Sequence, residues 1–274
     1  MRLWRRLELL LAAAFVMACV NQGQAASVLY GSSDLVDLFT IDLATGHGTR
    51  VGSLPASATE IEFDTLTGRA YLQYINGAFQ IQQFNINTAA GIGAPVNDGG
   101  SFTGLEFVGP TLYGTVITAS QGPSTLRILN PTTGVSSVIG QTGVGPISGL
   151  AYNESTAVMY GIAGGPGPAS LYMVNLSTGA ATLVGSSGIQ AGSLEFGPDG
   201  ILYAGGTGPN GGNLYRINPS TGLATLVGPT GFGAVTGLTL ANPVPEPSSI
   251  WLMSLSILSF ACVAAYKGIR KRGR

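Results

Sequence analysis

An internal repeat with a period of about 44 residues is the feature that most constrains the fold of this chain. A turn of the pattern polar-x-x-small-Gly occurs five times, at Asp42 to Gly46, Asn87 to Gly91, Asn130 to Gly134, Asn175 to Gly179 and Asn218 to Gly222. The last residue of an LEF-like run recurs at Phe63, Phe107, Tyr152, Phe196 and Leu240, and the tyrosine of an LYG-like run at Tyr30, Tyr71, Tyr113, Tyr160 and Tyr203. Three markers with one period indicate five copies of a single unit.

Each copy contains four short runs with strand character, separated by turn residues. In the clearest copy they cover residues 192–196, 201–205, 213–218 and 223–228. Four antiparallel strands in about 44 residues are typical of one β-propeller blade. The first copy lacks its leading strand, and a strand of that kind, residues 236–241, follows the last copy.

Pairing this C-terminal strand with the N-terminal three closes a ring and removes exposed sheet edges. The sequence therefore predicts an all-β domain over residues 27–242, a five-bladed β-propeller of four-stranded blades. An open solenoid of β-hairpins is the alternative, but it does not explain why the strand missing at one end is present at the other.

Charge is unevenly distributed along the chain. Eight of the twelve basic residues lie in the two end segments, whereas residues 27–243 contain four Arg against eleven Asp and Glu, a net charge of −7. An acidic domain is a poor partner for a nucleic-acid backbone. The same stretch has no Cys and no Lys, which excludes a disulfide framework, a cysteine zinc site and a P-loop.

The N-terminal residues 1–26 are typical of a secretory signal peptide. Arg2, Arg5 and Arg6 precede an apolar run over residues 7–20, and small residues at Ala25 and Ala26 suit a signal peptidase. An uncleaved membrane anchor and a lipoprotein cut before Cys19 are the alternatives.

The C-terminal residues 243–274 combine three features in a fixed order. Pro245, Glu246 and Pro247 are followed by residues 250–266, a run of 17 without a charge, and then by a basic cluster over residues 267–274. At about 1.5 Å per residue such a helix just crosses a thin bilayer, and the basic cluster favours the cytoplasmic side.

This tail resembles the PEP-CTERM sorting signal of Gram-negative bacteria. The resemblance covers about 30 residues and implies recognition of Pro245, Glu246 and Pro247 by an exosortase, a membrane-embedded cysteine transpeptidase that removes the tail. It also implies export through the inner membrane, a cell-surface or extracellular location, and an association with exopolysaccharide and biofilm. The repeats, in turn, resemble those of exported bacterial propeller proteins of uncertain role.

Three glutamates are the main candidates for a functional site. Glu62, Glu106 and Glu195 are each the middle residue of an LEF-like strand, and the other two copies carry Ala151 and Thr239 there. If that strand is innermost, three carboxylates meet at the central channel. Their repeat position favours a structural role, in which they accept hydrogen bonds from neighbouring backbone. A cation site, with calcium as the ion, and a sugar site are the alternatives, because five-bladed glycosidases place carboxylates around such a channel.

The remaining candidate sites, a histidine and two glycine-rich loops, give weaker indications of function. His47 lies in a TGHG turn and is expected at the surface, while the glycine-rich loops 164–168 and 206–212 are expected on one rim, where binding surfaces form. We therefore expect no catalytic residue and no cofactor, and a structural or binding role for the propeller. The alternative is a polysaccharide-acting enzyme or a lectin that uses the channel or the rim.

Overall fold

The computed structural model describes residues 26–117, 122–165 and 167–242, and they form five antiparallel sheets of four strands each. The first blade contains β20 (Val235–Ala241), β1 (Val28–Ser33), β2 (Asp37–Ile41) and β3 (Gly48–Ser53), in this spatial order. The second contains β4 (Ala58–Asp64), β5 (Arg69–Ile75), β6 (Phe79–Phe84) and β7 (Gly91–Asn97). The third contains β8 (Phe102–Val108), β9 (Thr111–Ile117), β10 (Ser124–Leu129) and β11 (Ser136–Gln141).

The last two blades follow the same order. The fourth contains β12 (Ile147–Asn153), β13 (Val158–Ala163), β14 (Ser170–Val174) and β15 (Ala181–Ser186). The fifth contains β16 (Ala191–Phe196), β17 (Leu202–Gly206), β18 (Asn213–Ile217) and β19 (Ala224–Pro229), with the short 3₁₀ helix η1 (Gly208–Asn210) between β17 and β18.

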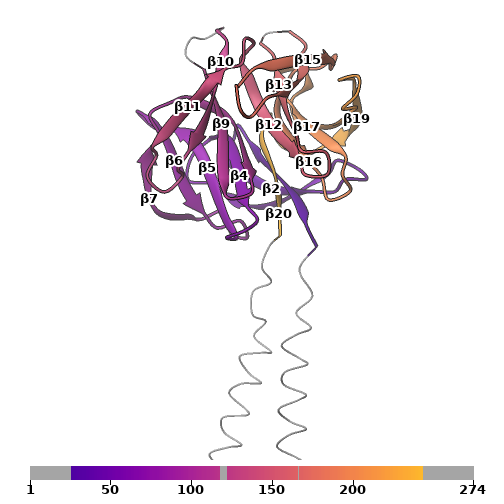
Figure 1. The fold of residues 1–274 in the computed structure, drawn as a ribbon. Helices are drawn as coiled ribbons and strands as arrows, with labels where there is room; N and C mark the ends of the chain where they lie inside the picture. Colours follow the sequence, from indigo (N-terminus) through magenta and orange to yellow (C-terminus); the bar gives the residue numbers. More distant parts are fainter. Residues whose placement is uncertain (1–25, 118–121, 166, 243–274) are drawn as a thin grey trace, which may run out of the picture. The chain divides into compact units, whose positions relative to one another are not determined.

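The first strand of each blade lies innermost, and these five strands form a closed ring. β4, β8, β12, β16 and β20 each pack against the next, and β20 packs against β4. β20 also pairs antiparallel with β1, so that Val28 faces Ala241, and Figure 1 shows this yellow strand beside the indigo N-terminal strands. The predicted five-bladed propeller, closed by its C-terminal strand, is confirmed.

The repeated turn lies between the third and fourth strands of every blade. In each copy the side-chain oxygen of a leading Asp or Asn accepts the backbone N–H two positions later, which is an Asx turn. The residue four positions later has a left-handed φ, and in four blades it is glycine.

The second of these turns differs from the prediction. It runs from Asn85 to Ala89, so the prediction of Asn87 to Gly91 was wrong by two residues, and Gly91 instead begins β7. Ala89 has φ +63° and its N–H donates to the Asn85 carbonyl at 2.8 Å. An alanine in this conformation costs about 1–2 kcal/mol, and here it is completely buried.

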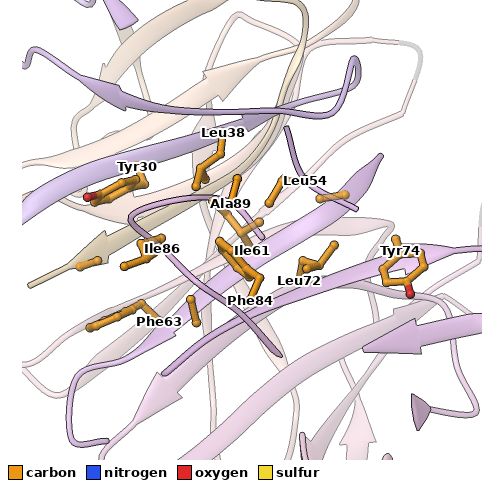
Figure 2. Packing of buried hydrophobic residues seen from close by; sticks show 13 residues of the cluster. Tyr30, Leu38, Leu54, Ile61, Phe63, Leu72, Tyr74, Phe84, Ile86 and Ala89 are labelled. Atoms are coloured by element: carbon orange, nitrogen blue, oxygen red, sulfur yellow. The ribbon is translucent and has the colours of Figure 1, made fainter. Parts of the chain in front are cut away.

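The hydrophobic core is divided among the blade interfaces. Buried apolar residues of the described chain form five clusters, one between each pair of neighbouring blades. Figure 2 shows the cluster in which Tyr30 and Leu38 of the first blade face Ile61, Phe63 and Phe84 of the second. Every blade therefore buries both of its faces, and opening the ring at any interface would expose the apolar side chains of two blades.

The predicted signal peptide, apart from Ala26, and the predicted sorting tail, residues 243–274, lie outside the described residues. Within the described residues, no helix has the length and apolar character needed to cross a membrane.

Candidate functional site

The ring of inner strands brings the three predicted glutamates together. Glu62 lies on β4, Glu106 on β8 and Glu195 on β16, and one carboxylate oxygen of each lies within 4.8 Å of the others. The three side chains are buried, with exposed fractions of 3%, 6% and 6%. Ala151 of β12 and Thr239 of β20 hold the same place in the other two blades.

Strand alternation explains why the acids share one level of the ring. Each of the five positions pairs across the sheet with the repeated tyrosine, as Glu62 does with Tyr71 and Glu195 with Tyr203. The flanking residues of Glu62, Ile61 and Phe63, point to the opposite side of β4 and pack into a hydrophobic cluster. The same spacing in every copy therefore places the equivalent side chains at equivalent points of the channel.

The carboxylates accept hydrogen bonds from the backbone of the inner strands. The N–H of Phe107, on the next blade, donates to Glu62 Oε1 at 3.1 Å, and the Glu62 carboxylate also accepts from Phe63. Glu106 accepts from Tyr152 of the following blade. Glu195 accepts from Phe196 at 2.8 Å and from Leu240.

These contacts follow a rule. Five N–H groups, one from each inner strand, face the channel edge, and three carboxylates accept all of them. Where the preceding blade carries an acid, that acid accepts the bond, as Glu62 does for Phe107. Where the preceding blade carries Ala151 or Thr239, it offers no carboxylate. The N–H group then donates to the glutamate just before it on its own strand, as Phe196 does to Glu195 and Phe63 to Glu62. The acids thus satisfy strand edges that no other strand covers.

Burial determines the electrostatics of the cluster. Loss of hydration raises the pKa of Glu62 to about 8, although the hydrogen bonds from Phe107, Thr239 and Phe63 oppose the rise. Burial also raises the pKa of Glu106 and of Glu195 well above the ordinary value, and the charges of neighbouring carboxylates raise it further. With a pKa of about 8, Glu62 is mostly protonated at neutral pH.

A fourth acid was missed by the sequence reasoning. Glu60 lies two residues before Glu62 on the same side of β4, is only 2% exposed, and accepts hydrogen bonds from Ile61 and Leu238. Burial, and then the charges of Glu62 and Glu195, raise its pKa well above the ordinary value. The period of two along a strand was the signal that could have identified it.

The three acids line a cavity of about 390 Å³ at the end of the channel where the inner strands terminate. Its wall also contains Asn153 at the end of β12, Glu154 and Ser155 of the turn that follows, and Ser27, the residue before β1. Ser27 donates a hydrogen bond to Asn242, so the described chain enters and leaves the propeller beside this cavity. The volume is within the usual range of small-ligand sites.

The other predicted candidates lie elsewhere. His47 is exposed in the turn between β2 and β3, as expected. The loops near 164–168 and 206–212 connect β13 to β14 and β17 to β18, at the opposite end of the strands from the cavity. Pro245, Glu246 and Pro247 lie outside the described residues.

Comparison with known proteins supports the fold alone. No protein-family model and no curated protein matches this chain. Its structure is similar to a chain from the crystal structure of a nidogen/laminin complex, with a TM-score of 0.52 and 13% identity, over 80% of this chain and 86% of that one.

Proposed function

We propose that this protein is exported and sorted to the cell surface by an exosortase-type transpeptidase, where its non-catalytic propeller has a structural or binding role in exopolysaccharide. The observation that carries the proposal is the order of segments after the last strand. Pro245, Glu246 and Pro247 precede an uncharged run of 17 residues and a basic terminus. This order is that of the PEP-CTERM signal, and the signal-peptide pattern of residues 1–26 fits the export that it requires.

The geometry of the acids supports a role without catalysis. Glu62, Glu106 and Glu195 occupy a repeat position and use carboxylate oxygens to hold N–H groups of the inner strands. Each of these carboxylates uses an oxygen to accept backbone N–H groups of the ring, which is the role expected of an acid at a repeat position.

The sorting proposal is tested in a Gram-negative host that contains an exosortase. The full chain is compared with a variant in which Pro245, Glu246 and Pro247 are all replaced by Ala, and with a matched control carrying Ser248→Ala and Ser249→Ala. The wild-type chain and the control are expected to lose the tail, seen as a mass decrease by mass spectrometry, and to leave the membrane fraction. The triple variant is expected to retain the tail. Equal processing of all three chains, or processing in a host without exosortase, contradicts the proposal.

One observation favours a second candidate, a lectin or polysaccharide-acting enzyme. Acids with raised pKa values line a cavity of about 390 Å³, and such groups serve as general acids in glycosidases. Residues 26–243 form a compact unit by themselves, so this unit is screened on a glycan array with product analysis. Cleavage that is lost in Glu106→Gln would support the enzyme, and retention without cleavage would support the lectin.

A further inference from the structure

The three channel carboxylates have no cationic side chain beside them. None of the four Arg in the described residues lines the cavity. Arg50 pairs with Asp37, Arg127 donates to Ser136, and Arg216 donates to the Leu43 carbonyl. No basic side chain of the described residues is therefore placed to balance the negative charge that Glu62, Glu106 and Glu195 carry when they ionise.

Two carboxylate oxygens also lack a hydrogen-bond partner. Glu62 Oε2 and Glu106 Oε2 are buried and unpaired, while the same carboxylates accept backbone N–H groups. Both side chains are more than nine-tenths buried and line the cavity. An unsatisfied buried carboxylate oxygen destabilises the folded state, and a ligand bound at this point would offset that cost.

The spacing of the oxygens suits a metal ion. Oxygens that all lie within 4.8 Å of one another share a point about 2.8 Å or less from each, close to the ~2.3–2.6 Å of calcium–oxygen contacts. The Thr239 hydroxyl, which donates to Glu62, is a further oxygen at the same level. Calcium accepts six to eight oxygens in irregular geometry, including water, whereas magnesium requires a near-ideal octahedron at about 2.0–2.1 Å.

We propose that Glu62, Glu106 and Glu195 bind one divalent cation, Ca²⁺ in preference to Mg²⁺, at the cavity end of the channel. The ion bridges β4, β8 and β16, the inner strands of the second, third and fifth blades. It binds the folded ring and not the unfolded chain, so it stabilises the closed propeller by mass action. The site does not depend on the proposed sorting, because all of its residues lie in the propeller.

The test uses purified 26–243 stripped with EDTA. Equilibrium dialysis against ⁴⁵Ca²⁺ is expected to show one ion per chain, with a Kd on the order of 10⁻⁵ to 10⁻³ M. The melting temperature is expected to rise with CaCl₂ and to rise less with MgCl₂ at the same concentration. Less than about 0.1 ion per folded chain at 10 mM Ca²⁺, far above the expected Kd, overturns the proposal, and this result requires no variant.

Two isosteric variants locate the ion. Glu106→Gln is expected to weaken Ca²⁺ binding at least ~10-fold, as loss of metal-site groups does. Glu154→Gln removes an exposed acid from the wall of the same cavity and is expected to bind like the wild type. If Glu106→Gln does not fold, Glu195→Gln replaces it. Binding that is equal in the folded glutamate variants and the wild type places the ion elsewhere and overturns the proposal.

Discussion

Two positions of the repeat differ in how strictly the five blades keep their residue: the first residue of the Asx turn and the channel position on the inner strand. The Asx turn keeps an Asp or Asn in every blade, at Asp42, Asn85, Asn130, Asn175 and Asn218. The channel position carries Glu in only three blades, with Ala151 and Thr239 in the other two.

The difference reflects where each polar requirement is met. A turn has to satisfy its own N–H groups, because no other part of the chain reaches them, so every copy needs its own side chain. The channel N–H groups are shared, and Glu62 and Glu195 each accept two of them. The Asx turn therefore keeps its Asp or Asn in every blade, whereas the channel position can lose its Glu in two blades because neighbouring glutamates accept the N–H groups there.

The largest effect is expected from a substitution at Gly134, in the Asx turn of the third blade. Gly134→Ala places a side chain at φ +72°, with its Cβ 2.0 Å from the Asn97 carbonyl oxygen of the neighbouring blade. Left-handed strain and the collision together are expected to destabilise the domain by about 3–5 kcal/mol in urea unfolding. Gly143→Ala is the matched control, because Gly143 has φ +75° with nothing within 4 Å, and a loss of only ~1 kcal/mol is expected. Equal losses in the two variants would exclude the blade contact as the cause.

The next prediction concerns pH and the channel ring. The acidic groups that face one another there are Glu60, Glu62, Glu106 and Glu195, with Asp64 acting on Glu62, whereas Ala151 and Thr239 on the remaining inner strands do not titrate. Their folded-state pKa values are raised, to about 8 for Glu62, so the folded state binds more protons than the unfolded state at intermediate pH.

Stability in EDTA is therefore expected to be greatest below about pH 4.5 as far as these groups are concerned, and to fall as pH rises towards 8. A loss on the order of 2–4 kcal/mol between pH 5 and pH 8.5 is expected in urea unfolding. The triple variant Glu62→Gln, Glu106→Gln and Glu195→Gln is expected to flatten this dependence. Stability that increases over the same range would show that the acids are ionised in the folded protein.

Because the channel glutamates accept different numbers of backbone N–H groups, replacing them is expected to destabilise the domain by different amounts. Glu62→Leu leaves the N–H groups of Phe63 and Phe107 without an acceptor, whereas Glu106→Leu leaves only that of Tyr152. Losses of about 2–3 and about 1–2 kcal/mol, respectively, are expected for the two variants in EDTA. Urea unfolding measures both, and Glu154→Leu on the exposed turn serves as the control. Equal losses, or a larger one for Glu106→Leu, would contradict the sharing rule.

The sequence alone was sufficient to predict the features that recur at the same point of every repeat. The number of blades and the closing strand followed from the period and from the extra strand at residues 236–241. The second turn was misplaced because the pattern required glycine, whereas Ala89 adopts the left-handed conformation. Glu60 was missed because the other blades carry Gly or Ser at its position. The sharing of N–H groups depends on which blade precedes which in space, and no single copy contains that information.

The smallest effect is expected at the one turn that departs from glycine. Ala89→Gly relieves about 1–2 kcal/mol of left-handed strain but removes a buried methyl worth ~0.8 kcal/mol and adds about 0.4–1 kcal/mol of freedom to the unfolded chain. These terms nearly cancel, so urea unfolding is expected to change by less than about 0.5 kcal/mol. The neighbouring blade presents Gly52 to this turn, with its ideal Cβ position 3.1 Å from the Ala89 methyl. A change as large as that of Gly134→Ala would contradict this prediction. It would show that the Ala89 methyl, and not the absence of a side chain at Gly52, determines how the first two blades pack at this turn.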